Sequence, residues 1–262
     1  MSYSTFAVAK AKARAIIAEW SIMNPAEIDL EIIASQMNLL IIERSITGAV
    51  ARIVCKGSAG FISVSDRIIE SGRKRFAIAH EIGHYVLHRS AKPLTICTDD
   101  DFQDWYEQSP AETEANVFAA ELLMPEDLFR PRCADKTPSF AEVQRLAHEF
   151  QTSLSAAAIR YVNIGNKACV LVASKNGKIE WVSANSAFPY RVNGRGVNLD
   201  KYSCANDFFQ SGKTPSSRES VIGTAWLTDY GIGENCFLYE EVIPLKSYNT
   251  VLSLIWIDED NN

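Results

Sequence analysis

The stretch that decides the fold is AIAHEIGHYVLH, residues 77–88, which carries three of the four histidines in the 262-residue chain. His80 and His84 are four positions apart. On a helix this spacing gives about 40° of rotation and about 6 Å of rise. Two imidazoles so placed can hold one ion at about 2.0–2.1 Å from each ring nitrogen. The stretch therefore predicts a helix, expected over 69–87, that carries part of a metal site.

Glu81 directly follows the first of these histidines. It lies about 100° around the same helix, where it can flank an ion without binding it and can accept a proton from an activated water. This is the chemistry of the H-E-x-x-H pattern. Gly83 lies between the two histidines, and glycine costs roughly 1 kcal/mol inside a helix. We therefore expect a neighbouring backbone to approach closely at Gly83. The alternative is an ordinary helix with surface histidines.

His88 differs from the other two histidines because it lies eight residues after His80. That spacing places it about 12 Å further along the helix, too far to bind the same ion. A metzincin would need a third histidine six residues after His84, where Ser90 stands. We interpret His88 as a cation favoured by the helix C-terminus; a role beside the ligands or on the substrate is the alternative.

A catalytic zinc usually takes three protein ligands, so a third must come from elsewhere in the chain. Glu114 is the preferred candidate, because it borders the apolar stripe of AETEANVFAAELL and would be costly to bury without a cation. Small alanines in this segment would let it approach another helix closely. The weaker candidates are expected in solvent: Glu112, Glu121, His148 and the acidic loop Asp99–Asp101.

The two segments RFAIAHEIGHYVLH and EANVFAAELLMP together resemble the signature of the ImmA/IrrE metallopeptidases, gluzincins with an HExxH…E ligand set, in their longer IrrE-like form. The resemblance covers about residues 8–163. It implies that His80, His84 and Glu114 bind the metal and that Glu81 is the general base. It also implies that Glu114→Ala abolishes metal binding and that His88→Ala does not. Zinc is the default ion for such ligands, with manganese or iron as alternatives. Tyr85 and His88 are candidate donors to the oxyanion.

The elements predict an α+β fold with three parts. Residues 1–130 form a zincin-like metallopeptidase domain with a small β-sheet and helices, residues 131–164 a helix-turn-helix-like segment, and residues 165–262 a β-rich, mixed α/β GAF-like domain. Helices are expected over 6–19, 24–36, 110–123 and, as a pair, within 137–163. Strands are expected over 39–43, 49–57 and 59–66. The segment GFISVS, residues 60–65, is either an edge strand that takes an extended substrate or an internal strand.

The resemblance implies a metal-dependent endopeptidase that cleaves a helix-turn-helix transcriptional repressor and so relieves repression in a stress or mobile-element response. The alternative is a DNA-binding or protein-binding regulator whose metal site is structural or vestigial. A net charge of -6 disfavours a large phosphate-binding surface. In the second helix of the pair, only Arg160 offers a cation to a phosphate. A partner role in a toxin–antitoxin operon is a third alternative.

The cysteine content and the hydropathy of the chain bear on the kind of metal site and on the cellular compartment. Six cysteines occur without a CxxC pair, which disfavours a cysteine zinc site and favours reduced thiols in a cytosol. No run of about 18 apolar residues is present, and the N-terminal segment is typical of an amphipathic helix and not of a signal peptide. We therefore expect a cytoplasmic protein without membrane contact. The GAF-like domain is expected to sense a small ligand.

Overall fold

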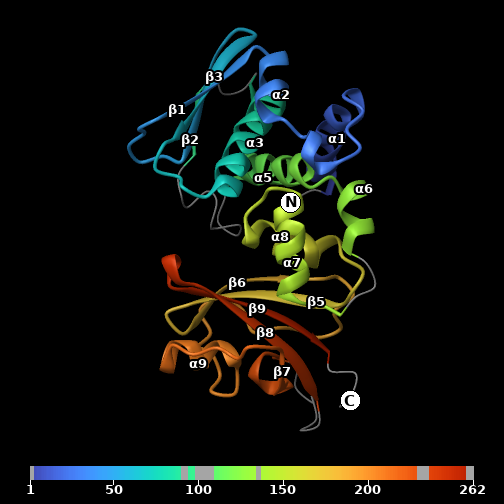
Figure 1. Cartoon of the computed structure of the whole chain (residues 1–262), viewed down its shortest axis with the longest axis vertical. Helices are drawn as coiled ribbons and strands as arrows, with labels where there is room; N and C mark the ends of the chain where they lie inside the picture. Colours follow the sequence, from blue (N-terminus) through green and yellow to red (C-terminus); the bar gives the residue numbers. More distant parts are fainter. Residues whose placement is uncertain (1–2, 90–93, 98–108, 134–136, 229–235, 258–262) are drawn as a thin grey trace. The chain divides into compact units, whose positions relative to one another are not determined.

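The computed structural model describes residues 3–89, 94–97, 109–133, 137–228 and 236–257. Within these residues the fold is α+β, because helices accompany two separate β-sheets (Figure 1). The chain divides into two compact units. The first comprises Met1–Phe129 with Ala147–Ser153, and the second comprises Arg130–Leu146 with Leu154–Asn262. The segment expected to be helix-turn-helix-like is thus shared between the two units.

The first unit contains a four-stranded sheet in the order β1-β3-β2-β4. Its strands are β1 (Leu39–Arg44), β2 (Ala51–Lys56), β3 (Ala59–Ser65) and β4 (Leu94–Cys97). β1 runs parallel to β3, with Leu39 opposite Gly60 and Arg44 opposite Ser65. The β2–β3 and β2–β4 pairs are antiparallel. The segment GFISVS lies in β3 and is therefore an internal strand and not an edge strand, because β3 pairs with β2 on one side and with β1 on the other.

Several helical segments of the described residues lie wholly within the first unit. They are α1 (Tyr3–Glu19), η1 (Pro25–Glu27), α2 (Leu30–Gln36), α3 (Ser71–His88), α5 (Pro110–Leu123) and α6 (Glu126–Phe129). The predicted helix over 24–36 is interrupted, because Asp29 starts a new helix: its Oδ1 accepts from the amides of Glu31 at 2.9 Å and Ile32 at 3.0 Å. The predicted helix over 110–123 is confirmed as α5.

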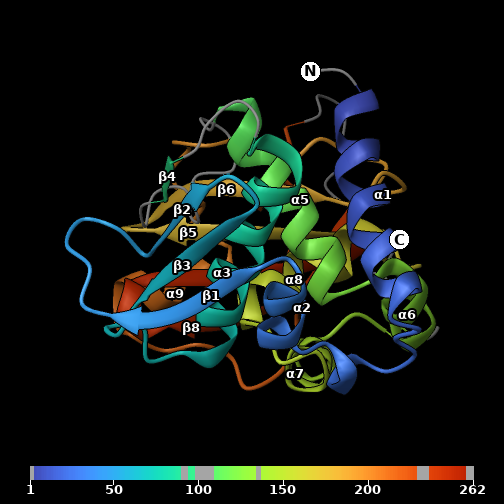
Figure 2. The same cartoon turned by 90° about the horizontal axis from the view of Figure 1, so that it is seen from above.

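α5 packs against α3 on one side and α1 on the other (Figures 1 and 2). The close approach predicted at Gly83 is confirmed. A Cβ built there would lie 3.0 Å from Cδ1 of Phe118 and 3.2 Å from the carbonyl oxygen of Ala115. Because the second of these atoms is α5 backbone, a side chain at this position would require α5 to move away from α3 by a few tenths of an ångström. This packing brings side chains of α5 to the histidines of α3.

The contact of α1 with α5 contains an ion pair around Glu121. Arg14 donates from Nε to Oε1 of Glu121 at 2.7 Å and from Nη2 to Oε2 of Glu126 at 2.9 Å. Glu121 is fully buried, so the expectation that it lies in solvent is wrong. The guanidinium supplies the charge that makes this burial tolerable.

The second unit contains a five-stranded antiparallel sheet in the order β6-β5-β9-β8-β7. Its strands are β5 (Cys169–Lys175), β6 (Lys178–Ala184), β7 (Glu219–Ile222), β8 (Phe237–Leu245) and β9 (Thr250–Ile257). α8 (Leu154–Ile164) contacts β5 and β6, and α9 (Cys204–Ser211) contacts β8 and β9. The two helices lie on opposite faces of the sheet (Figure 1). The sheet is therefore covered on both faces, which agrees with the nearly continuous burial of β5 and β9.

α9 was not predicted; it is an eight-residue helix that Glu240 anchors to the sheet. The carboxylate of Glu240 accepts from the backbone amides of Cys204 at 2.9 Å and Ala205 at 3.1 Å, at the start of the helix. It also accepts from Nε1 of Trp226 at 2.9 Å and from Oγ of Ser253 at 3.0 Å. Four donors thus compensate a fully buried carboxylate, and the helix depends on a partner distant in sequence.

α7 (Phe140–Glu149) precedes α8, and the two occupy the positions predicted for a helix pair. η2 (Arg130–Cys133), η3 (Gly223–Ala225) and η4 (Lys246–Tyr248) are single 3₁₀ turns. Among the residues that the structure describes, no helix is both long and apolar enough to cross a membrane.

Candidate metal centre

Three potential ligand atoms converge between α3 and α5. Nε2 of His80 lies 2.9 Å from Nε2 of His84. Oε2 of Glu112 lies 3.0 Å from the first of these nitrogens and 3.1 Å from the second. Among the described residues, His80, His84 and Glu112 form a group of side chains that is able to hold a metal ion. The sequence predicted two of its three members together, His80 and His84.

The donor atoms have the chemistry and spacing of a zinc site. A tetrahedral ion bound at about 2.0–2.1 Å holds its ligand atoms about 3.3 Å apart, close to the separations between these three. Two neutral imidazoles and a carboxylate all point lone pairs at one place, so a cation is the group that satisfies all three. His80, His84 and Glu112 therefore fit a divalent metal of the zinc class.

The electrostatics of the cluster keep Glu112 ionised. Burial raises the pKa of Glu112, but the contacts of its carboxylate with His80 and His84 outweigh burial and hold that pKa well below its usual range. The side chain of Glu112 is only 14% exposed, so the expectation that it lies in solvent is wrong. An ionised, largely buried carboxylate is the form that binds a metal.

The structure differs from the sequence prediction at the third position. Oε2 of Glu114 lies 2.9 Å from Nε2 of His88 and is not a member of the three-residue cluster. Glu112 and Glu114 are two residues apart on α5, which separates them by about 200° around the helix. Only one of them can therefore face the two ligand histidines, and the helix presents Glu112 from its first turn, just after the N-cap Ser109.

Asn116 was not among the predicted site residues. Its Oδ1 lies 2.8 Å from Nδ1 of His80, and its side chain is buried. Nδ1–H of His80 donates to this oxygen, which leaves Nε2 with its lone pair directed at the cluster. A signal for Asn116 existed: it lies four residues after Glu112, on the α5 face that also carries the small Ala115 and Ala119.

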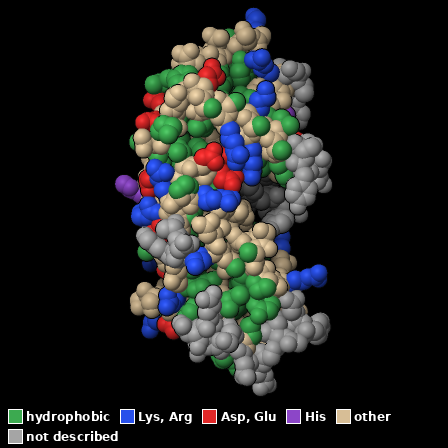
Figure 3. All heavy atoms as spheres, turned by 90° about the vertical axis from the view of Figure 1, so that its right-hand side faces the viewer, with side chains coloured by type: hydrophobic (Ala, Val, Ile, Leu, Met, Phe, Trp, Pro, Cys, Tyr) green, Lys and Arg blue, Asp and Glu red, His purple; other side chains and the backbone are tan. Residues whose placement is uncertain are grey.

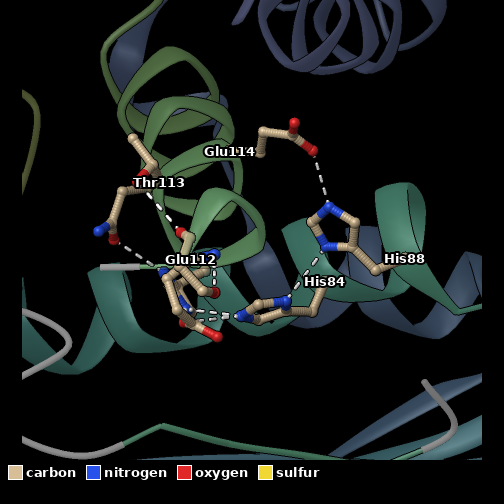
Figure 4. Close-up of polar contacts among 8 residues, drawn as sticks. His84, His88, Glu112, Thr113 and Glu114 are labelled. Atoms are coloured by element: carbon tan, nitrogen blue, oxygen red, sulfur yellow. Dashed lines mark hydrogen bonds and ion pairs between the residues drawn. The ribbon is translucent and has the colours of Figure 1, made fainter. Parts of the chain in front are cut away.

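His84, the other histidine of the cluster, has a different support (Figure 4). Nδ1 of His84 lies 3.3 Å from Nδ1 of His88, and Nε2 of His88 reaches the carboxylate of Glu114. His88 lies in the last turn of α3, at the position that the sequence predicted. It contacts the cluster through His84 and contributes no atom to it.

The predicted base and the predicted oxyanion donors lie on the same helix. Glu81 is fully buried beside His80. The hydroxyl of Tyr85 points to the carbonyl oxygens of Met37 at 3.1 Å and Ser58 at 3.0 Å. It also accepts from Nη1 of Arg89 at 2.9 Å. Because His88 is engaged by Glu114 and His84, both candidate donors are committed to contacts within the fold.

The remaining sequence candidates do not join the cluster. His148 is exposed near the end of α7 and is not among the three clustered residues. The acidic loop Asp99–Asp101 lies outside the described residues.

A nucleic-acid interface on α8 is not supported. Arg160, the cation expected to reach a phosphate, is only 6% exposed. On the face shown in Figure 3, acidic and basic side chains are intermixed, and no large patch of a single sign is visible. Binding to a duplex requires a concentrated basic surface, which neither α8 nor this face provides.

Comparison with known proteins adds two findings. Residues 34–161 match the model of a peptidase family, M78, described as the IrrE N-terminal-like domain. A solved structure of a Mycobacterium tuberculosis transcriptional regulator is similar, with a TM-score of 0.56 and 13% identity over 95% of this chain and 75% of that chain. At this identity the likeness concerns the fold alone. None of the curated proteins matches the chain.

Proposed function

We propose that this chain, which belongs through residues 34–161 to the ImmA/IrrE family of M78 peptidases, is a metal-dependent endopeptidase. The observation that carries the proposal is the convergence of His80, His84 and Glu112 within about 3 Å of one another on two tightly packed helices. His80, His84 and Glu112 would hold the ion, with zinc as the default. Manganese and iron suit the same ligands.

The chemistry divides between the ion and Glu81. A divalent metal in such a site supplies a Lewis acid that polarises a carbonyl and lowers the pKa of a water molecule. Glu81, one residue after His80 and buried with it, accepts the proton of the attacking water at its carboxylate. It then passes the proton to the leaving amine. Asn116 and His88 hold the two ligand imidazoles in place.

The proposed substrate is a protein, and specifically a helix-turn-helix transcriptional repressor whose cleavage relieves repression in a stress or mobile-element response. The family resemblance supports this substrate class. The similar mycobacterial structure is a transcriptional regulator by its description, which agrees with a role in gene control. The burial of Arg160 favours action on a protein over direct binding to DNA.

The finer assignments of the two units are also proposals. The first unit is zincin-like, supported by the mixed sheet of β1–β4 and by α3 with its H-E-x-x-H pattern. The second unit is GAF-like and senses a small ligand, supported by its antiparallel sheet covered on both faces by helices. We place the protein in the cytoplasm, where such a repressor is found.

Substitution of the proposed base tests the function. The repressor encoded beside this protein is co-expressed with the wild type or with Glu81→Gln, and intact repressor is followed over time. We expect cleavage by the wild type and a loss of at least 100-fold in Glu81→Gln, because the amide cannot accept the proton. Cleavage by the variant at the wild-type rate would show that the peptidase assignment is wrong.

A matched control separates chemistry from folding. Glu19→Gln makes the same change at an exposed position of α1, and it should cleave as the wild type does. Both variants should bind zinc, since neither removes a ligand. If the wild type leaves the repressor intact but shifts duplex DNA at about 150 mM salt, the regulator alternative replaces the peptidase.

A further inference from the structure

The contact between His84 and His88 has a direction, because each neutral imidazole carries one proton. Their Nδ1 atoms lie 3.3 Å apart, so one must donate and the other must accept. His84 can offer the lone pair of Nε2 to an ion only if its proton lies on Nδ1. In that state His84 donates and His88 accepts.

Glu114 selects this direction from the far side of His88. A carboxylate has no proton to donate, so its 2.9 Å contact with Nε2 of His88 requires that nitrogen to carry the proton. A neutral His88 then has a lone pair on Nδ1, which accepts from His84. The opposite assignment would place a lone pair of His88 against the carboxylate of Glu114, and it would put the proton of His84 on Nε2, where it blocks metal binding.

The positions of these side chains are set by packed elements (Figure 4). His84 and His88 are four residues apart on one face of α3, and their ring centroids are 5.4 Å apart. Glu114 comes from α5, which Gly83 holds close to α3. The side chains of His88 and Glu114 are 16% and 20% exposed, so the pair is shielded from most of the solvent that would otherwise compete for the proton.

The support of His80 provides a comparison within the same site. Its Nδ1 proton goes to the neutral amide oxygen of Asn116 at 2.8 Å. The Nδ1 proton of His84 instead goes through a second ring to a carboxylate. A series of hydrogen bonds that ends at a carboxylate increases the electron density on the first imidazole, and that imidazole then binds a cation more strongly.

We propose that His88 and Glu114 are a positioning pair that fixes the metal-ready tautomer of His84 and strengthens metal binding without either residue binding the ion. The proposal rests on the proposed function, because it takes His80, His84 and Glu112 as the ligands. In this proposal Glu114 supports a ligand histidine through His88, whereas the sequence predicted that Glu114 itself binds the ion.

The first test observes the tautomers directly. The chain has four histidines, so ¹⁵N–¹H spectra of the metal-free protein can be assigned to single rings. We expect His84 to be protonated at Nδ1 and His88 at Nε2 in the wild type at pH 8. In Glu114→Ala, His88 should lose its preference and His84 should become a mixture. Glu114→Gln should retain the wild-type pattern, because its carboxamide oxygen still accepts from Nε2–H.

The second test measures affinity for Zn²⁺ by competition with a chromophoric chelator. We expect Glu114→Ala and His88→Ala each to weaken binding 10–100-fold while still binding one ion per chain. Glu114→Gln should lie between Glu114→Ala and the wild type. The double variant should bind no more weakly than His88→Ala alone, because Glu114 acts through His88. Glu19→Gln should bind as the wild type.

The outcomes separate this inference from the proposed function. Wild-type affinity and wild-type tautomers in Glu114→Ala would overturn the inference and leave the peptidase proposal standing. Additive losses in the double variant would also overturn it. If Glu114→Ala binds no ion whereas Glu112→Ala does, Glu114 is a ligand and the inference is wrong. If the wild type itself binds no metal, the proposed function fails and the inference fails with it.

Discussion

At the scale of single residues, the candidate centre depends on where two protons lie. Each histidine of the cluster directs Nε2 to the other members and engages Nδ1 elsewhere, His80 with Asn116 and His84 with His88. These contacts fix the rings before any ion arrives. They are therefore expected to contribute to affinity as well as to the fold.

Asn116 is the residue at which this expectation is simplest to test. Asn116→Leu keeps the volume but leaves Nδ1–H of His80 buried without its acceptor, which should cost about 1–3 kcal/mol of unfolding free energy. Zinc affinity should fall about 10–100-fold. Asn116→Asp keeps an acceptor at the same place and should retain most of the affinity. Denaturant unfolding and chelator competition give the two readings, and equal zinc affinity in Asn116→Leu and wild type would contradict the role.

The choice between Glu112 and Glu114 as the third member of the cluster could not be predicted correctly from the sequence. A helical wheel favoured Glu114, because it borders the apolar stripe that contains Phe118. The wheel gives the direction in which a side chain leaves α5 but not which neighbour faces it. Gly83 brings α3 against Ala115, and this turns Glu112 and Asn116 toward the histidines. Contacts between helices distant in sequence decided between the two glutamates.

At the scale of elements, local signals predicted the helices and nonlocal pairing decided the sheets. α5 follows its prediction at both ends, because Ser109 caps it and Pro125 follows it. β3 was ambiguous, since only its parallel pairing with β1 makes it internal. α9 was missed because its first turn is completed by Glu240 of β8, 36 residues away from Cys204. The caps of α9, Ser203 at its start and Gly212 at its end, were local signals that the sequence prediction did not use.

The spacing between α3 and α5 yields a prediction at this scale. Gly83→Ala gains about 1 kcal/mol in helix propensity, but its methyl group would press on Phe118 and on the backbone of Ala115. We expect a net destabilisation of about 1–3 kcal/mol and weaker zinc binding, since α5 carries Glu112. Gly194→Ala adds the same methyl group where nothing lies within 4 Å, and both properties should stay unchanged in that variant. A more stable Gly83→Ala protein with full zinc affinity would contradict this account of the helix spacing.

At the scale of the whole molecule, the candidate metal ligands all belong to the first unit, and the second unit has a separate hydrophobic core. His80, His84 and Glu112 all lie in Met1–Phe129. The second unit has its own hydrophobic core around Trp226 and Leu238, and none of the clustered ligands comes from it. Metal binding should therefore act on the stability of the first unit.

Hydrogen exchange with and without zinc tests this division. A ligand present at 100 times its Kd stabilises the folded state that binds it by about 2.7 kcal/mol. Amides of α3 and α5 that exchange by unfolding of the first unit should therefore slow about 100-fold when zinc is added, whereas amides of β5 and β9 should exchange at the same rate. Glu112→Ala lacks the third ligand, so zinc at the same concentration should leave its α3 and α5 amides nearly unprotected. Equal slowing in β5 and β9 would mean that the ion stabilises both units as one cooperative body. Slowing of about 100-fold in Glu112→Ala would mean that the ion binds elsewhere.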